Sequence, residues 1–332
     1  MASRSINRVK LLASLIVASL ASSIALAQPP QKAWKVGILW HAANLQDEMV
    51  MYQPFADGLR DLGYAEGRNV NFYHTFADEK YDRFKANAQE LVDQRVDIIM
   101  ASTADAAAAA AKVTRAIPIV FAASGDPVKA GLVVSLRRPG GNVTGFSLVY
   151  PELANKHLEM LHDIVPGLSK VAVLWHPANQ DHPDTLKDAQ RSAKLLNIEV
   201  ISVSASSPDE FAGAFAKMER LRVNGLVVLG DAMFRVNRDA IVALAARGRL
   251  PTIYAPRDYV EAGGLISYGA CIPCNFRSSA TYIDKILKGA KAADLPVQQP
   301  TRFEFVINLK TAKALGLAIP PSIRVRADEI IE

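Results

Sequence analysis

The sequence predicts an α/β protein of two similar Rossmann-like lobes, each with a parallel sheet, joined by three crossing segments. Short runs rich in β-branched residues alternate with longer amphipathic or alanine-rich segments, as in parallel α/β domains. The same order of segments occurs twice along the chain. In addition, 332 residues are more than one hydrophobic core usually covers.

The clearest repeat is the predicted first strand of each half with the three residues that follow it. Residues 35–44 read KVGILWHAAN and residues 170–179 read KVAVLWHPAN, so that seven of ten paired positions are identical. A shared preference for Val, Ile and Leu accounts for similar strands, but not for a Trp-His pair at the same place. We therefore expect the halves to share one fold.

The other elements correspond in the same order. The remaining strands are predicted at 69–73, 97–100 and 117–121 in the first half and at 198–203, 225–229 and 250–254 in the second. Helices are predicted at 48–62, 80–94, 103–112 and 127–137, then at 151–164, 182–196, 208–220 and 234–248. One further helix is predicted near 276–289.

Each half ends in a double-glycine segment, 140–145 or 263–269, which suits a chain that crosses between lobes because glycine tolerates unusual backbone angles. An extended stretch at 296–305 predicts a third crossing. Three crossings describe a hinge, and hinges permit closure around a ligand. The predicted boundaries are residues 34–143 plus 269–297 for lobe 1 and residues 144–268 plus 298–332 for lobe 2.

Residues 1–27 predict a cleaved signal peptide. Three basic residues precede an uncharged apolar stretch at 11–24, and the small residues at 25–27 suit a cleavage site. The apolar stretch is shorter than the roughly 20 residues that span a bilayer. We therefore expect export, to the periplasm in a Gram-negative cell, without membrane insertion after cleavage.

Charge and motifs argue against several classes of function. The formal charge of +5 includes three positive residues of the signal peptide, which leaves 5 − 3 = +2 for the rest. No Lys/Arg cluster interleaves with aromatic residues, so a nucleic-acid partner is not expected. No phosphate-binding loop, dinucleotide fingerprint or nucleophile elbow follows a predicted strand, so neither a cofactor nor catalysis is expected.

Candidate ligand-binding residues lie at the strand ends, because ligands of open parallel sheets bind beyond the carboxyl ends of the strands. Two polar segments of the first half each precede a predicted helix, whose first N–H groups favour a carboxylate, although an ordinary helix cap explains each one alone. Two aspartates are candidate partners for a ligand amine, and three aromatic residues offer faces for a ring. The candidates are Trp40, His41, Ser102, Thr103, Ser124, Asp126, His176, Asp231, Tyr254 and Tyr268.

Two further clusters are given weaker interpretations. Cys271 and Cys274 form a C-x-x-C motif near a predicted helix start, which indicates a local disulfide or an idle thiol pair and leaves thiol redox catalysis as an alternative. A metal site is not expected there, because two further ligands are absent. His182 and Asp181 belong to a polar loop that fits no metal motif and is expected to be solvated.

Five long stretches resemble the ABC-transporter substrate-binding proteins of the tryptophan/tyrosine-type group, which have the type I periplasmic binding protein fold. They are Phe55 to Asn69, Gly125 to Gly145, Val171 to Asn179, Glu261 to Gly269 and Gln299 to Pro321. After Gly269 the chain reads ACIPCN and departs from the family's usual SYG-x-x-x-P-D pattern. The resemblance implies that Thr103, Asp126, Asp231 and Tyr254 line the cleft.

The resemblance also implies delivery of a small-molecule solute to an ABC permease that a cytoplasmic ATPase powers. The preferred ligand is an aromatic amino acid, with its carboxylate near Ser102 and Ser124, its amine at Asp126 or Asp231, and its ring at Trp40 or Tyr254. Two alternatives remain open at this point. One is a binding protein that serves a sensor kinase or a chemoreceptor, and the other is a periplasmic thiol oxidoreductase that uses Cys271 and Cys274.

Overall fold

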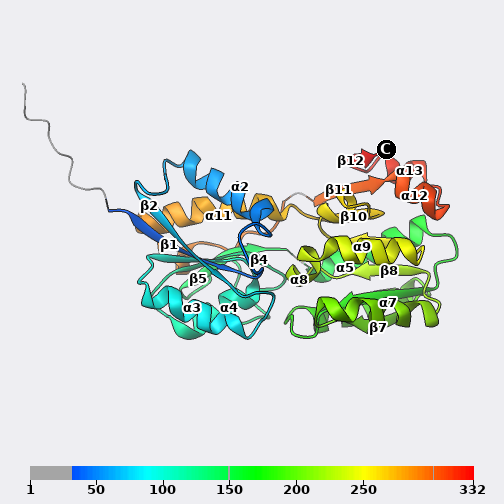
Figure 1. Ribbon diagram of the computed structural model, residues 1–332, viewed down its shortest axis with the longest axis horizontal. Helices are drawn as coiled ribbons and strands as arrows, with labels where there is room; N and C mark the ends of the chain where they lie inside the picture. Colours follow the sequence, from blue (N-terminus) through cyan, green and yellow to red (C-terminus); the bar gives the residue numbers. More distant parts are fainter. Residues whose placement is uncertain (1–31, 149, 302) are drawn as a thin grey trace, which may run out of the picture. The chain divides into compact units, whose positions relative to one another are not determined.

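The computed structural model describes residues 32–148, 150–301 and 303–332, and the predicted signal peptide lies outside them. The part from Trp34 to Glu332 contains two α/β lobes, each built on its own sheet (Figure 1). Strands and helices alternate along the chain as predicted, so the predicted α/β class with two lobes is confirmed.

The first sheet has the strand order β2-β1-β3-β4-β5, and every neighbouring pair is parallel. Its strands are β1 (Trp34–Trp40), β2 (Val70–Phe76), β3 (Ile98–Ala101), β4 (Ile119–Ser124) and β5 (Val143–Ser147). Successive side chains of a strand point to opposite faces. Ile38 therefore packs in a core with residues of α2 and α11, whereas Leu39 packs in a core with residues of α3 and α4.

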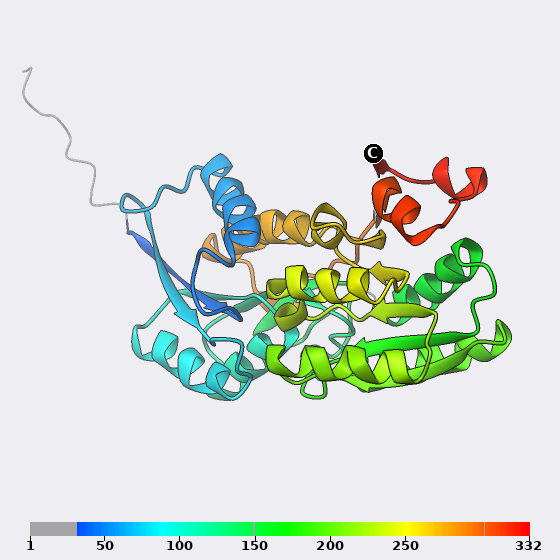
Figure 2. The ribbon, with the colours of Figure 1, turned by 45° about the vertical axis from the view of Figure 1, so that its right-hand side comes forward.

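The helices of the first lobe come from distant parts of the sequence. They are α2 (Met49–Asp61), α3 (Arg83–Asp93), α4 (Ala104–Val113) and α11 (Ile272–Leu287). In the two views α2 and α11 lie side by side, although more than 200 residues separate them (Figures 1 and 2). The late segment α11 thus completes the core of the first lobe.

The second sheet has the order β12-β11-β10-β9-β8-β6-β7. Its strands are β6 (Lys170–Trp175), β7 (Glu199–Ser204), β8 (Gly225–Val228), β9 (Thr252–Tyr254), β10 (Ile266–Ala270), β11 (Phe303–Asn308) and β12 (Glu329–Ile331). The pairs are parallel except for β10 with β11, which is antiparallel. This exception arises because β11 enters the sheet from the third crossing.

The second lobe carries eight described α-helices, several of them short. They are α5 (Tyr150–Ile164), α6 (His182–Leu195), α7 (Phe211–Arg220), α8 (Ala232–Val236), α9 (Arg238–Arg247), α10 (Asp258–Glu261), α12 (Leu309–Leu315) and α13 (Pro321–Arg324). Two 3-10 turns, η1 (Pro208–Glu210) and η2 (Ala292–Asp294), complete the described helical elements. Among the described residues, no helix combines the length and apolar character needed to cross a membrane.

The chain passes between the lobes near the predicted crossings. It leaves the first sheet after β5, so this strand extends four residues beyond the predicted boundary at residue 143. The second passage lies between β10 and α11, and the third lies between Gln298, which bridges to β5, and β11. The lobe boundaries themselves stay a prediction.

One predicted helix, at 127–137, is wrong. The Asp126 carboxylate accepts hydrogen bonds from the N–H groups of Val128 and Lys129, which closes a single turn. Gly131 then has φ of 68°, a left-handed conformation that stops a right-handed helix. The predicted helix at 234–248 is divided into α8 and α9 at Asn237.

Candidate functional site

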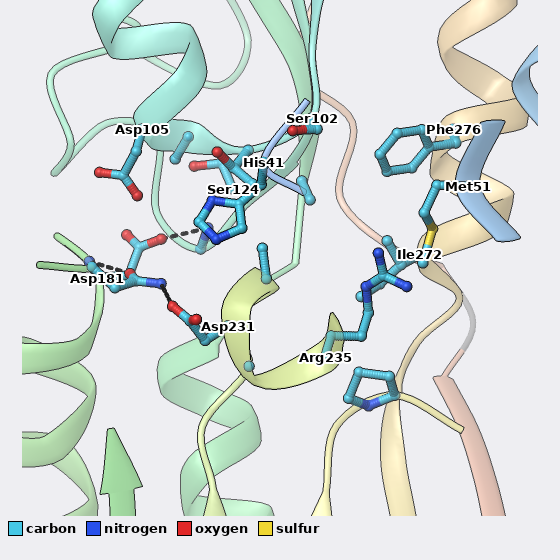
Figure 3. A pocket seen from close by; sticks show the side chains of 18 of the residues that line it. His41, Met51, Ser102, Asp105, Ser124, Asp181, Asp231, Arg235, Ile272 and Phe276 are labelled. Carbon is cyan, nitrogen blue, oxygen red and sulfur yellow. Dashed lines mark hydrogen bonds between the residues drawn. The ribbon is translucent and has the colours of Figure 1, made fainter. Parts of the chain in front are cut away.

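A cavity lies where the carboxyl ends of the first-lobe strands face the second lobe (Figure 3). It holds about 690 Å³ of space free of protein atoms, including its opening to solvent. Its lining is His41, Glu48, Met51, Tyr81, Ser102, Thr103, Ala104, Asp105, Ala123, Ser124, Gly125, Asn179, Asp181, Gly230, Asp231, Ala232, Arg235, Pro256, Ile272 and Phe276.

The first lobe contributes buried polar groups that have no hydrogen-bond partner among the described residues. These groups are both ring nitrogens of His41 after β1, the Ser102 hydroxyl after β3 and the Ser124 hydroxyl at the end of β4. The three residues are 1%, 5% and 2% exposed. Because an unpaired buried polar group is costly, such groups indicate that a ligand belongs beside them.

The adjoining Thr103 caps α4. Its hydroxyl oxygen accepts a hydrogen bond of 3.2 Å from the Ala106 N–H. The first N–H groups of a helix have no partner within the helix, and the helix dipole adds a partial positive charge there. The start of α4 therefore suits the carboxylate of a ligand.

The second lobe contributes Asp231, whose carboxylate is fully engaged. One oxygen accepts hydrogen bonds from the N–H groups of Met233 and Phe234, so that Asp231 caps α8. The other oxygen accepts from the Tyr81 hydroxyl and the Asn179 amide, each at 2.9 Å. Burial opposes ionisation, but nearby histidines and these donors outweigh it and lower the pKa of Asp231.

A second carboxylate of this lobe, Asp181, occupies the turn that follows β4. Its oxygens accept hydrogen bonds from the N–H groups of Gly125 at 2.9 Å and Asp126 at 3.3 Å. The turn that was expected to receive a ligand carboxylate thus already holds one from the chain itself. Of the two predicted anion-binding positions, the start of α4 is the one that this contact leaves open.

Arg235 and Glu48 form a buried ion pair between the lobes, with an N–O distance of 2.9 Å. Their side chains are 8% and 3% exposed. The Arg235 guanidinium also lies 3.7 Å from Asp258. Burial raises the pKa of Glu48 and of Asp258, and Arg235 partly offsets that rise in both.

Several polar contacts between described residues connect the two lobes around the cavity, which describes a closed arrangement. They join Tyr81 to Asp231, Gly125 and Asp126 to Asp181, Glu48 to Arg235 and Glu79 to Asn237. In each pair the first residue lies in the part of the chain that forms the first sheet.

The cavity is chemically asymmetric. Asp105, Asp181 and Asp231 lie at one end, whereas apolar side chains and Arg235 lie at the other (Figure 3). The apolar side chains labelled there are Met51, Ile272 and Phe276. Such a site suits a molecule with a polar head and an apolar body.

The pKa values of Asp105 and His41, two residues of the lining, are strongly shifted. Burial, then the charges of Asp181 and Asp231, raise the pKa of Asp105 to about 7. Burial lowers the pKa of His41 to about 4, so this ring is neutral at pH 7 and offers one donor and one acceptor.

Five of the ten predicted ligand-binding residues line the cavity, namely His41, Ser102, Thr103, Ser124 and Asp231. The other five, Trp40, Asp126, His176, Tyr254 and Tyr268, lie outside its lining. Trp40 is fully buried, and its ring stacks on that of Phe276 with 5.8 Å between the ring centroids. Asp126 faces its own turn, as described above.

The remaining three make contacts within the second lobe, and the His176 ring also stacks on Tyr81 of the first lobe, with 4.9 Å between the ring centroids. The His176 ring nitrogens contact the Ser206 carbonyl oxygen and the Ala178 N–H. Tyr254 stacks on Tyr259 at 4.5 Å, and Tyr268 stacks on Phe303 at 5.7 Å. None of these contacts is visible in the sequence.

Sequence reasoning missed most of the lining, including Glu48, Asp105, Asp181, Arg235 and Phe276. The expectation of a solvated loop around Asp181 is wrong, because His182 is fully buried between the His176 N–H and the Gly230 carbonyl oxygen. A signal was present for two residues: Asp105 lies in the first turn of a predicted helix, and Asp181 lies just beyond a predicted strand end.

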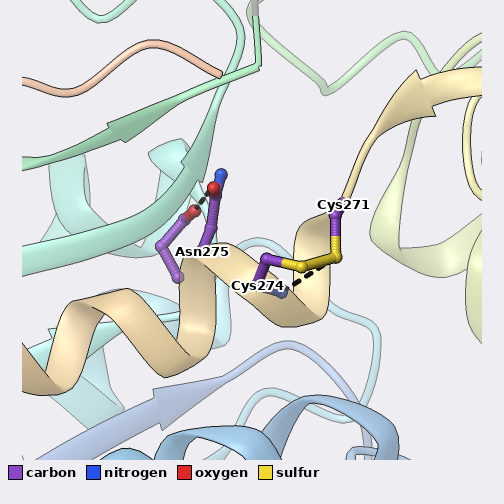
Figure 4. The surroundings of a disulfide bond; sticks show 4 residues. Cys271, Cys274 and Asn275 are labelled. Atoms are coloured by element: carbon purple, nitrogen blue, oxygen red, sulfur yellow. Dashed lines mark hydrogen bonds between the residues drawn. A yellow bond between two sulfur atoms is a disulfide. The ribbon is translucent and has the colours of Figure 1, made fainter. Parts of the chain in front are cut away.

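Cys271 and Cys274 form a disulfide at the start of α11, with 5.2 Å between their Cα atoms (Figure 4). The Cys271 sulfur also accepts a hydrogen bond from the Cys274 N–H at 3.2 Å. The bond adjoins Ile272, a lining residue. Within the described ranges, no group of three or more His, Cys, Asp or Glu side chains is arranged to hold a metal ion.

Comparison with known proteins identifies related sequences and structures. A family model described as ABC transporter substrate binding protein matches residues 44–331. A curated relative, the tyrosine-binding protein of Clostridioides difficile (strain R20291), is 28% identical over 263 residues, which are 79% of this chain and 75% of the relative.

Two solved structures are similar over 90% of this chain and 100% of their own. One is an ABC domain in complex with L-Trp from Streptococcus pneumoniae, with 26% identity and a TM-score of 0.82. The other is a conserved domain protein from Vibrio cholerae, with 27% identity and a TM-score of 0.84. These likenesses confirm the predicted type I periplasmic binding protein fold.

Proposed function

Because the chain belongs to the ABC transporter substrate binding protein family, we propose that it captures an aromatic amino acid between its lobes and delivers it to a membrane permease. The observation that carries this proposal is the cavity itself. It combines three buried polar side chains that have no hydrogen-bond partner in the described part of the chain, His41, Ser102 and Ser124, with an apolar end. That combination matches a zwitterionic head and an aromatic body.

The ligand would lie along the cavity with its head toward the first lobe. Its carboxylate would meet the Ser102 hydroxyl and the first N–H groups of α4. Its ring would lie between Phe276, Met51 and Ile272, where the Arg235 guanidinium adds a cation beside an aromatic face. This placement replaces Trp40 and Tyr254, which do not line the cavity, as the partners of the ring.

The relatives support an aromatic amino acid as the ligand. One is described as a tyrosine-binding protein, and one solved structure is a complex with L-Trp. The pattern of residues 1–27 supports export to the periplasm. There the loaded, closed form would be the state that an ABC permease with a cytoplasmic ATPase receives.

The test is a thermal-shift screen of residues 28–332 against tryptophan, tyrosine, phenylalanine and non-aromatic amino acids. A ligand that binds only the folded protein at a hundredfold excess over its Kd adds about 2.7 kcal/mol of stability. We expect a clear rise in melting temperature with the aromatic amino acids alone.

The matched controls are two Ala→Trp variants. Ala232→Trp adds bulk to the cavity lining and should abolish the shift, whereas Ala216→Trp, on an exposed face of α7, should keep it. A shift with non-aromatic solutes only would contradict the aromatic ligand. A shift that survives in Ala232→Trp would contradict the site.

A further inference from the structure

Asp105 is a carboxylate of the cavity lining whose ionised form its surroundings disfavour. It lies in the first turn of α4, faces the cavity, and is partly exposed to it. Burial first, and then the carboxylates of Asp181 and Asp231, disfavour its charge, whereas the Gln180 amide and the Asp105 N–H favour it. A positive group beside Asp105 would relieve this repulsion.

The other aspartates of the region are already engaged. Asp231 accepts four hydrogen bonds, from Tyr81, Asn179 and the start of α8. Asp181 is held by two backbone N–H groups of the first lobe. Asp126 caps its own turn outside the cavity. A ligand amine at any of these three would have to compete with those donors, whereas at Asp105 the donors already present are the Gln180 amide and its own N–H.

An independent observation indicates that a ligand belongs next to Asp105. The His41 ring, the Ser102 hydroxyl and the Ser124 hydroxyl line the same cavity, and each residue is more than nine-tenths buried. Within the described part of the chain, none of these groups has a hydrogen-bond partner. Figure 3 shows His41 and Ser124 between Asp105 and the apolar end.

Ligand contacts at Ser102 and at Asp105 fit the two charges of an amino acid head. Both residues lie at the N-terminal end of α4, three positions apart in the sequence. The helix start favours a carboxylate. The Asp105 side chain extends from the first turn toward Asp181 (Figure 3), and a carboxylate in that position favours an ammonium group.

We propose that Asp105 is a specificity-determining residue that receives the ammonium group of the bound solute and so makes a primary amine a requirement for tight binding. This inference rests on the proposed function and deepens it, because it names the group that the protein selects. An aromatic acid without the amine would leave the Asp105 carboxylate buried near two further carboxylates. Such acids therefore bind more weakly than the amino acid.

The test compares two ligands that differ only in the amine, L-tryptophan and indole-3-propionate, by calorimetric titration at pH 8. With the unchanged protein, tryptophan should bind at least about tenfold more tightly, as expected for a charge-assisted hydrogen bond. With Asp105→Asn, tryptophan should weaken by about the same factor, while indole-3-propionate should bind as well as before or better. The ratio of the two affinities should therefore approach one.

Asp93→Asn is the matched control, because Asp93 is an exposed aspartate of the neighbouring helix α3. It should leave both affinities unchanged, and the melting temperatures of the variants show that they fold. Equal loss of both ligands in Asp105→Asn, or no preference for the amine in the unchanged protein, would overturn the assignment of Asp105. If no indole, phenol or phenyl compound bound the unchanged protein, the proposed aromatic ligand itself would be overturned.

Discussion

The two lobes start from similar strand sequences but present their strand ends to the cavity differently. His41 lines the cavity with both ring nitrogens free of partners among the described residues. Its repeat counterpart His176 lies outside the lining, and its ring nitrogens are engaged by the chain. The first lobe therefore offers groups that a ligand can satisfy, whereas the second lobe offers a wall whose hydrogen bonds are already made.

This difference implies a division of labour. We propose that ligand recognition resides mainly in the first lobe, at His41, Ser102 and Ser124, whose buried polar atoms have no partner among the described residues. Closure resides in contacts that the second lobe makes across the cavity, through Arg235 and Asp231. Substitutions on the two sides should therefore affect closure and recognition separately.

The largest effect is expected at the buried ion pair that closes the cavity. Arg235→Met leaves Glu48 buried in the closed form without its cation, which costs about 3–5 kcal/mol, or roughly a hundredfold or more in Kd. Calorimetric titration with the aromatic ligand measures this loss. The double variant Glu48→Gln with Arg235→Met should recover part of the affinity.

Arg257→Met is the control for that prediction. Arg257 pairs with Glu261 and Glu329 in a largely solvent-screened position. Exposed pairs contribute little, so the affinity should hardly change. An Arg235→Met protein that binds as tightly as the unchanged one would show that closure does not depend on this pair.

Two serines, one from each lobe, should have opposite effects: one substitution should weaken ligand binding and the other should lower stability. Ser102→Ala removes a hydroxyl that has no partner among the described residues, so it should leave the ligand-free melting temperature nearly unchanged. It should weaken ligand binding by about 1.5–3 kcal/mol, roughly tenfold or more, because a hydrogen bond to a charged group is lost. A cost to stability without a cost to affinity would contradict recognition by the first lobe.

Ser202→Ala should show the opposite pattern. The Ser202 hydroxyl accepts a hydrogen bond of 2.8 Å from the Trp175 indole N–H in the second lobe. Its removal should lower the free energy of unfolding by about 1–3 kcal/mol, since a partly buried donor loses its acceptor. The ligand affinity of this variant should stay the same.

The preference for the amine should depend on pH. In the closed cavity the pKa of Asp105 is raised to about 7, above its ordinary value of 3.8, so closure on a ligand without an amine takes up a proton below pH 7. Protonation of Asp105 therefore favours binding of a ligand without an amine at acid pH, and this contribution to binding is lost as pH rises through about 7. Indole-3-propionate should bind about tenfold more tightly per pH unit below 7, relative to tryptophan, and the ratio should be flat above 7.

The ratio of the two ligand affinities cancels the effects of the other ionisable groups around the cavity, because both ligands close the same cavity. Those groups are His41, Glu48, Tyr81, Asp181 and Asp231, whose pKa values also differ from their ordinary values. In Asp105→Asn the ratio should not vary with pH. A pH dependence that persists in this variant would assign the titration to another group.

The smallest effect on binding is expected at the disulfide, which lies at the passage between the lobes. Replacing Cys271 and Cys274 by serine should lower stability by at most about 2 kcal/mol, because the bond closes a very short loop. Ligand affinity should not change. An assay of dithiol-dependent insulin reduction should show no activity, and activity that disappears in Cys271→Ser would support the thiol oxidoreductase alternative.

Much of the fold could be predicted from the sequence because strands and helices are local patterns. The repeat of KV-x-x-LWH identified matching strands, and the hydrophobic runs located most elements. The predicted helix at 127–137 failed because the cap at Asp126 and the positive φ at Gly131 define a single turn. Composition alone did not distinguish that turn from a helix.

The sequence by itself determined that this protein is a two-lobed α/β protein and that the strand ends carry polar groups. Only the tertiary structure decided which of those groups face the cavity. The rings of Tyr254 and His176 find contacts in their own lobe. Arg235 and Asp181, by contrast, form hydrogen bonds with residues of the first lobe. The physical reason is that periodicity places a residue on an element, but a hydrogen-bond partner from the other lobe comes within reach only when the two lobes meet.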